Sequence, residues 1–292
     1  MTTLDPVWLD RQYNNRARIP EHPEIFERWE RASSLAREKS VCQIDLPYGK
    51  APHESLDVFL PTREKAPILV FIHGGYWRAL DKRDVSFVAP SFVQDGAMVV
   101  VPNYALCPAV SVETIVLQMV HAVEWAYRNA PTYGADRERI VVAGHSAGGH
   151  LAAMMLSCEW NRVAPDLPSD LVRAAISISG LFDLEPLRHT PFLMNDLRLT
   201  ADSVLRLSPA YFPAPAGTLH ALVGAQESEE FVRQNELVRQ VWGAQTVPIC
   251  EQIAGTHHLN VLHEFADSKG RAHELALQLL GLSDPSAADD RP

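Results

Sequence analysis

The chain has 292 residues, of which 47% are hydrophobic and 21% are charged. This is the composition of a globular protein that is long enough to bury one sizeable core. The formal net charge is −10 at pH 7, and Lys and Arg do not cluster along the sequence. Nucleic acids and anionic membrane surfaces are therefore poor candidates as partners.

The sequence indicates a cytoplasmic protein. Its first residues show no basic segment followed by an apolar run, so no secretory signal peptide is expected. The longest uncharged stretch, residues 140–158, contains several Gly, His and Ser residues and is better explained by a buried strand and helix than by a membrane span. Four cysteines lie far apart without a C-x-x-C motif, which favours free thiols in a reducing compartment: Cys42, Cys107, Cys158 and Cys250.

The pattern of hydrophobic residues changes along the chain. Residues 5–39 have the composition of helices interrupted near Ile19 and Pro20, and predict a helical N-terminal extension over 1–40. From residue 41 the chain turns to strands: two alternating segments are typical of an antiparallel pair, and the later apolar runs are typical of strands buried on both faces. The expected strands cover 41–46, 54–60, 67–72, 97–101, 140–143, 174–180, 218–223 and 247–253.

Helical segments alternate with these strands, notably at 86–94, 112–129, 229–241 and 268–280. The alternation predicts an α/β fold with a mostly parallel central sheet, helices on both faces and two antiparallel lead-in strands. The main domain should cover 41–282. Within it, the proline-rich stretch 181–215 is expected to be irregular and lid-like, and 283–292 should be a flexible tail.

A short motif separates the apolar run at 140–143 from the helical residues after Leu151. Gly144-His-Ser-Ala-Gly148 matches the G-x-S-x-G turn that exposes a serine hydroxyl to a base. A turn this tight crowds its neighbours, which explains Gly144 and Gly148. Ser146 is thus the predicted nucleophile, and the backbone N–H of Ala147 is a predicted donor to an oxyanion. A nucleophile after the third parallel strand is the arrangement of the α/β-hydrolase fold.

A second glycine-containing motif, His73-Gly-Gly-Tyr-Trp77, follows the run at 67–72. It is similar to the HGG-type loop that supplies further oxyanion donors. The backbone N–H groups of Gly75 and Tyr76 are the predicted donors. Tyr76 and Trp77 also stand beside this loop as candidate aromatic contacts for a substrate, although packing under the lid explains either ring equally well.

In the α/β-hydrolase fold the chain order is serine, then acid, then histidine. Glu227 follows the strand expected at 218–223 and is the predicted acid, with Asp183, after the preceding strand, as the alternative. Glu229 and Glu230 are explained by the first turn of a helix. His258 follows the last strand and is the predicted base, with His257 orienting the loop.

A metal site built from His257, His258 and His263 has no supporting spacing. No metal and no cofactor are therefore expected. The predicted partner is a small aryl formamide or ester, and the sequence leaves open whether the protein forms a homodimer.

The chain resembles kynurenine formamidases (arylformamidases) of the α/β-hydrolase superfamily over nearly its whole length, up to about Leu280. The resemblance rests on five segments: His73-Gly-Gly-Tyr-Trp77, Gly144-His-Ser-Ala-Gly-Gly-His150, Ser179-Gly-Leu-Phe-Asp-Leu-Glu-Pro186, Glu227-Ser-Glu-Glu-Phe-Val-Arg-Gln234 and Tyr13-Asn-Asn-Arg16. By this resemblance the catalytic triad maps onto Ser146, Glu227 and His258. The family's histidine is followed by an apolar and a polar residue, as His258 is here.

The resemblance implies hydrolysis of N-formyl-L-kynurenine in tryptophan degradation. One departure is Glu227, where the family usually has Asp; many α/β-hydrolases use Glu, so a working triad with a slightly displaced carboxylate is expected. A broad carboxylesterase acting on small aryl or alkyl esters is the alternative activity. A non-enzymatic binding protein on the same scaffold is disfavoured, because the residues of the triad and both oxyanion motifs are intact.

Overall fold

The fold is built on an eight-stranded sheet, described over residues 4–283 in the computed structural model. The strand order is β1-β2-β4-β3-β5-β6-β7-β8. Pairing is antiparallel for β1–β2 and β2–β4 and parallel from β4 through β8, which confirms the predicted sheet. The strands are β1 Cys42–Pro47, β2 Ser55–Phe59, β3 Ala66–Ile72, β4 Met98–Pro102, β5 Ala135–His145, β6 Ala174–Ile178, β7 Thr218–Gly224 and β8 Ile249–Ile253.

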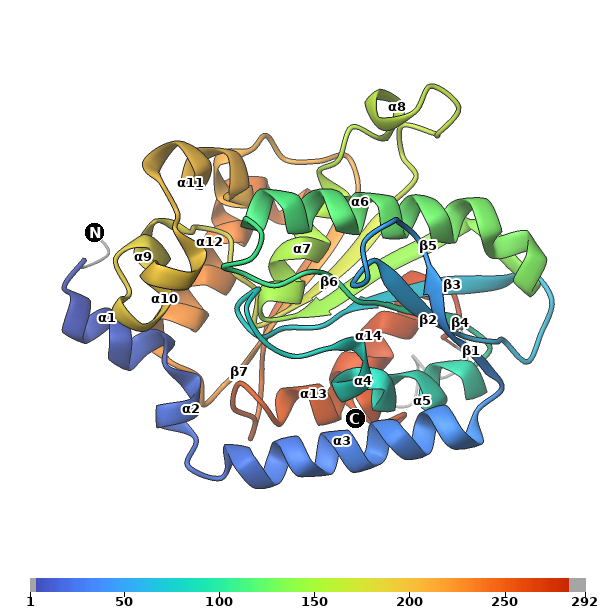
Figure 1. Cartoon of the computed structure of the whole chain (residues 1–292), viewed down its shortest axis with the longest axis horizontal. Helices are drawn as coiled ribbons and strands as arrows, with labels where there is room; N and C mark the ends of the chain where they lie inside the picture. Colours follow the sequence, from blue (N-terminus) through green and yellow to red (C-terminus); the bar gives the residue numbers. More distant parts are fainter. Residues whose placement is uncertain (1–3, 284–292) are drawn as a thin grey trace.

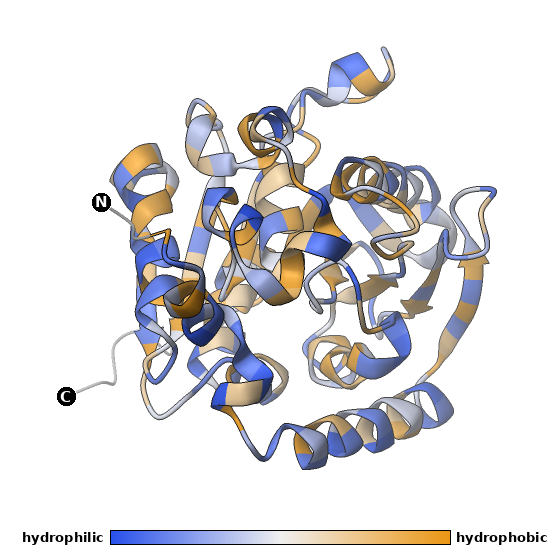
Figure 2. Ribbon diagram, turned by 60° about the vertical axis from the view of Figure 1, so that its left-hand side comes forward, coloured by the Kyte–Doolittle hydropathy of each residue, from blue (hydrophilic) through white to orange (hydrophobic). Residues whose placement is uncertain are grey.

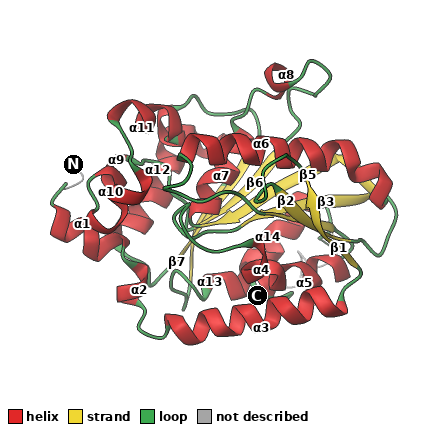
Figure 3. Ribbon diagram, viewed as in Figure 1, coloured by secondary structure: helices red, strands yellow, loops and turns green. Residues whose placement is uncertain are grey.

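Helices cover both faces of this sheet (Figures 1 and 3). Successive side chains of a strand point to opposite faces, so in β3 the residues Ile68, Val70 and Ile72 join one hydrophobic cluster while Leu69 and Phe71 join the other. The first cluster includes residues of α6 Val112–Asn129, α7 Ala147–Leu156 and α12 Glu229–Thr246. The second includes residues of α3 His22–Lys39, α5 Ala89–Gln94, α13 Val261–Ala266 and α14 Arg271–Leu280.

Three helices precede the sheet: α1 Pro6–Tyr13, α2 Asn15–Arg18 and the long α3. Figure 2 shows α3, at the bottom of the view, banded blue and orange, as expected of a helix with one buried face. Ile25 and Trp29 are buried on that face, whereas Leu35 is 49% exposed. An ion pair of 3.4 Å between Arg37 and the buried Asp57 of β2 attaches the end of α3 to the sheet.

Residues 181–215 are more ordered than expected. Instead of an irregular stretch they form α9 Glu185–Arg188, α10 Pro191–Leu197, α11 Ala201–Leu207 and a 3-10 helix, η3 Pro209–Tyr211. Pro186, Pro191 and Pro209 each stand in the first two positions of a helix. Proline is tolerated there because these positions need no backbone N–H for a helical hydrogen bond. The prolines therefore start helices in this segment instead of excluding them.

Two other expectations concern the whole chain. Within residues 4–283, no helix is both long and apolar enough to cross a membrane. All four cysteines lie in this part of the chain and are free thiols. The tail expected at 283–292 lies outside the described residues, apart from Ser283.

Candidate active site

Ser146 stands between the end of β5 and the start of α7, in a backbone conformation with φ 57° and ψ −116°. A positive φ is unfavourable for serine. The turn is also tightly packed: a Cβ atom on Gly144 would lie 2.1 Å from the carbonyl oxygen of Gly148, and one on Gly148 would lie 2.0 Å from that of Ile72. Both glycines are therefore required by close backbone approach, as the motif predicts.

The loop after β3 is a second strained segment. Gly75, Tyr76 and Trp77 have φ values of 97°, 50° and 55°, and a Cβ atom on Gly75 would lie 2.1 Å from the carbonyl oxygen of Ala79. The hydroxyl of Tyr104 holds the start of the loop by donating to the carbonyl oxygens of His73 (2.9 Å) and Gly74 (3.0 Å).

The predicted oxyanion donors remain available in this structure. In the part of the chain that is described, the backbone N–H groups of Gly75 and Tyr76 have no hydrogen-bond acceptor. Ala147 is the first residue of α7, where a helix leaves its N–H groups unpaired. Gly75, Tyr76 and Ser146 line one cavity, so the two loop donors and the serine belong to a common site, and Ala147 directly follows the serine.

Glu227 and His258 are in direct contact. Glu227 lies between β7 and α12, and His258 follows β8; the distance from His258 Nδ1 to Glu227 Oε2 is 2.6 Å. The Glu227 side chain is fully buried. Its other oxygen accepts from the Gly224 N–H at 2.8 Å and from the Ser179 hydroxyl at 2.5 Å. A buried carboxylate with these partners can hold the imidazole in one tautomer and orientation.

Asp183, the alternative acid, serves a different structure. Its carboxylate accepts from the Tyr211 hydroxyl at 2.9 Å and from the Glu185 N–H at 3.1 Å, and lies 3.6 Å from the guanidinium of Arg233. These contacts tie the start of the 181–215 segment to α12. The structure thus brings Glu227, and not Asp183, to the histidine.

The neighbouring histidines have structural partners. The ring of His257 accepts from the N–H groups of Leu259 and Asn260 at 3.2 and 3.3 Å, which shapes the loop that carries His258. His263 accepts from the Trp29 indole N–H at 3.0 Å. Among residues 4–283, no group of His, Cys, Asp or Glu is arranged to hold a metal ion.

Sequence reasoning missed two residues that position His258. His145 contacts the His258 carbonyl oxygen through Nε2 at 2.7 Å; burial lowers the pKa of His145 to about 3, with the neighbouring His258 contributing, so its ring is neutral and donates this hydrogen bond. Ser179 is the second, through its bond to Glu227. Ser179 follows β6, which lies beside β5 in the sheet. Because the carboxyl ends of parallel strands meet at one edge of the sheet, a polar residue directly after β6 was the available sequence signal.

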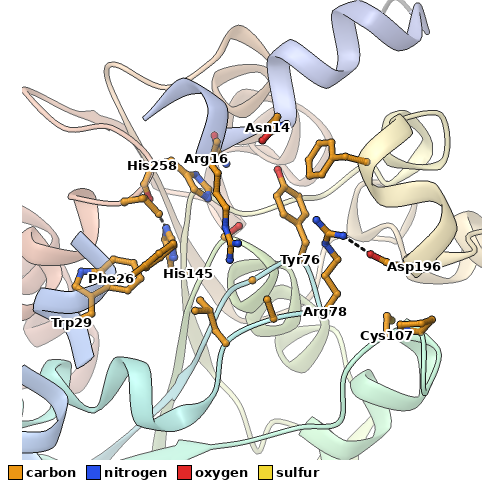
Figure 4. A pocket seen from close by; sticks show the side chains of 18 residues that line it. Asn14, Arg16, Phe26, Trp29, Tyr76, Arg78, Cys107, His145, Asp196 and His258 are labelled. Atoms are coloured by element: carbon orange, nitrogen blue, oxygen red, sulfur yellow. Dashed lines mark hydrogen bonds and ion pairs between the residues drawn. The ribbon is translucent and has the colours of Figure 1, made fainter. Parts of the chain in front are cut away.

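The cavity in front of Ser146 has a volume of about 550 Å³. Several distant segments line it besides Ser146 and His258. They include the N-terminal helices (Asn14, Asn15, Arg16, Phe26 and Trp29), the loop after β3 that carries Gly75 and Tyr76 (the oxyanion loop; also Arg78), the chain at Cys107 and Pro108, and α10 (Phe192 and Asp196). Figure 4 shows Arg78 beside Asp196, with which it forms an ion pair.

The expectation for Trp77 needs correction. Its side chain is fully buried and packs edge-on against His150, with the ring centroids 5.0 Å apart, and it does not line the cavity. Tyr76 and Trp77 both have a positive φ, and the side chain of Tyr76 lines the cavity whereas that of Trp77 belongs to the hydrophobic core. Of the two aromatic residues predicted to contact a substrate, the structure brings only Tyr76 to the site.

Comparisons with known proteins identify the family of this chain. The chain is 30% identical over 264 residues to the kynurenine formamidase of Danio rerio, covering 86% of this chain and 87% of that protein. The family model BD-FAE matches residues 56–202. The chain belongs to the kynurenine formamidase family.

Solved structures place this family member among the α/β-hydrolases. A structure described as a thioesterase from silicibacter sp. tm1040 superposes with a TM-score of 0.81 at 31% identity, over 90% of this chain and 97% of that one. An esterase from Pyrobaculum calidifontis superposes with a TM-score of 0.70 at 19% identity, over 96% and 99% of the two chains; this likeness shows the fold alone. The protein is accordingly an enzyme, an amide or ester hydrolase that acts on a small-molecule substrate.

Proposed function

We propose that this enzyme hydrolyses the formamide bond of N-formyl-L-kynurenine, or of a related aryl formamide, to formate and the free arylamine. The observation that carries the proposal is the 2.6 Å contact between Glu227 and His258, beside a serine that shares its cavity with His258 and the oxyanion loop. The relatives named kynurenine formamidase support the choice of substrate.

In the proposed mechanism, Ser146 Oγ attacks the formyl carbon while His258 Nε2 takes the hydroxyl proton. Glu227 keeps the proton on Nδ1 and stabilises the imidazolium that forms. The negative charge on the carbonyl oxygen is stabilised by the N–H groups of Gly75, Tyr76 and Ala147, where a single donor contributes about 3 kcal/mol to the transition state.

The tetrahedral intermediate then collapses. The C–N bond breaks, His258 gives its proton to the amine nitrogen, and the arylamine leaves with the formyl group on Ser146 Oγ. Water attacks this ester while His258 takes a proton from it, and the proton returns to Ser146 as formic acid departs and loses its own proton to solvent to become formate. One water is consumed, and the serine, His258 and Glu227 end as they began.

The formyl group is too small to provide selectivity, so the leaving arylamine must be recognised by the rest of the cavity. We propose that Tyr76 and Phe192, whose rings meet edge to face with centroids 5.8 Å apart, contact the aromatic ring. We propose further that the segment 181–215 acts as the lid of the site, because Phe192 and Asp196 of α10 line the cavity.

Steady-state hydrolysis of N-formyl-L-kynurenine and of p-nitrophenyl acetate tests this proposal. We expect a formamide kcat/KM at or above about 10⁴ M⁻¹s⁻¹, the low end of ordinary enzymes. Ester cleavage without formamide cleavage would instead assign the protein to the carboxylesterases, the alternative that relatives named as esterases support.

Replacing Gly75 by Ala should lower the formamide kcat by about 10² to 10³-fold, the effect of losing one oxyanion donor. The added Cβ atom would collide with the Ala79 carbonyl, 2.1 Å away, and displace the N–H groups. Gly134→Ala is the matched control, because Gly134 also has a positive φ (75°) but a Cβ atom there meets nothing within 4 Å. If Gly134→Ala lowered kcat as much as Gly75→Ala, the loss of activity would come from backbone strain and not from the oxyanion loop.

A further inference from the structure

Two neighbouring residues of α2 bring hydrogen-bond donors to the cavity that have no acceptor among the described residues. Arg16 lies with its guanidinium 5.3 Å from the centre of the Phe26 ring, and among residues 4–283 no carboxylate forms an ion pair with it. Asn15 also lines the cavity and is only 7% exposed, and its buried amide nitrogen has no hydrogen-bond acceptor within the described structure. A buried donor without an acceptor is costly unless a ligand provides one.

The position of these two residues is fixed relative to the reacting groups. The hydroxyl of Tyr76 donates to the carbonyl oxygen of Tyr13 at 2.7 Å, which joins the oxyanion loop to the end of α1. The Tyr13 hydroxyl in turn donates to Glu230 of α12 at 2.6 Å. Asn14 caps α2 through the N–H of Ala17. Figure 4 shows Arg16 extending into the cavity between His258 and Tyr76.

The charges of the cavity favour an anionic ligand. Its lining contains two guanidinium groups, Arg16 and Arg78, and one acidic side chain, Asp196. Because Asp196 pairs with Arg78, the positive charge of Arg16 is not balanced by the lining, in a chain whose net charge is −10. A planar guanidinium binds a carboxylate through two parallel hydrogen bonds, and the Asn15 amide would supply a further donor.

We propose that Arg16, with Asn15, binds a carboxylate on the leaving-group side of the substrate and so selects aryl formamides that carry one. The inference rests on the proposed function, since it names the part of that substrate that the enzyme recognises. N-formyl-L-kynurenine has such a group, its α-carboxylate. Arg16 does not touch the reacting atoms in this proposal and determines specificity by binding.

The test compares N-formyl-L-kynurenine with its α-carboxamide, which keeps the formamide and removes the negative charge. The measured quantity is the ratio of kcat/KM for the acid to kcat/KM for the carboxamide. We expect the wild-type enzyme to prefer the acid, and Arg16→Gln to lower this ratio by about 10- to 100-fold, the effect of losing a hydrogen bond between charged groups. The loss should appear mainly in KM for the acid, because the contact is the same in the ground and transition states.

Arg18→Gln is the matched control. Arg18 is also an exposed arginine of α2, but it contacts the Arg11 carbonyl and does not line the cavity, so the ratio should not change. A wild-type enzyme that cleaves acid and carboxamide equally well, or an Arg16→Gln variant with an unchanged ratio, would overturn the inference and leave the formamidase activity standing. A wild-type enzyme that cleaves neither formamide but cleaves p-nitrophenyl acetate would overturn the proposed function, and the inference with it.

Discussion

Replacing Ser146 by Ala should lower kcat for N-formyl-L-kynurenine by at least about 10⁴-fold, since removing the nucleophile of such a triad leaves only the catalysis due to binding and the oxyanion donors. No other hydroxyl stands at the turn between β5 and α7. Ala147 and the oxyanion loop are untouched by the change. Substrate affinity should therefore persist in the variant, and KM or an equilibrium binding measurement checks this.

The control for this variant is the folded state. Ser146 is 2% exposed and its hydroxyl makes no side-chain hydrogen bond among the described residues, so the midpoint of thermal unfolding should stay close to that of the wild type. A serine-reactive phosphonate should label the wild-type enzyme at Ser146 and fail to label the variant. Retention of more than a few per cent of the formamidase activity would exclude Ser146 as the nucleophile.

Replacing Glu227 by Gln should lower kcat by about 10⁴-fold, the effect of removing the charge of a triad acid while keeping its shape. The carboxylate now accepts from His258, Gly224 and Ser179. An amide has only one oxygen to accept with, so its NH₂ group must face one of these donors. If it faces His258, the ring takes the tautomer that cannot accept the serine proton at Nε2.

Asp183→Asn is the matched comparison, since it makes the same chemical change in the acid that follows the preceding strand. Its carboxylate contacts Tyr211, Glu185 and Arg233 instead of the histidine, so kcat should stay within about tenfold of the wild-type value. Measurement of kcat for both variants, with circular dichroism to confirm folding, decides the assignment. The reverse order of effects would identify Asp183 as the acid.

The framework of this protein follows from local patterns. Apolar runs such as residues 67–72 and 97–101 predict buried strands, and the structure has β3 and β4 there. Val112–Asn129 is a helix over the residues expected. The motif that contains Gly144 and Gly148 also predicts the serine turn. A side chain at either position would collide with a few nearby backbone atoms.

Other features depend on contacts between distant segments. The prolines of 181–215 predict an irregular lid, yet three of them begin helices. Proline is compatible with both structures, so its presence alone does not distinguish them. Trp77 and Tyr76 are neighbours with similar side chains, and only the direction of the backbone sends one into the core and the other into the cavity. The segment Tyr13-Asn-Asn-Arg16 contributes to the resemblance to kynurenine formamidases, but the sequence does not show that Arg16 reaches the cavity in front of Ser146.

The sequence alone predicts the order of the strands along the chain, the strained serine turn, and the two loops that provide an acid and a base. The three-dimensional contacts are needed to show that Glu227 contacts His258 while Asp183 lies beside Arg233, and that α2 brings Asn15 and Arg16 to the cavity. These two groups of features differ in the sequence separation of the residues whose contacts produce them. Strand periodicity and turn sterics act between residues close in sequence, whereas the pairing of Glu227 with His258, and of Tyr76 with Tyr13, requires the sheet to have brought the ends of separate strands and helices together.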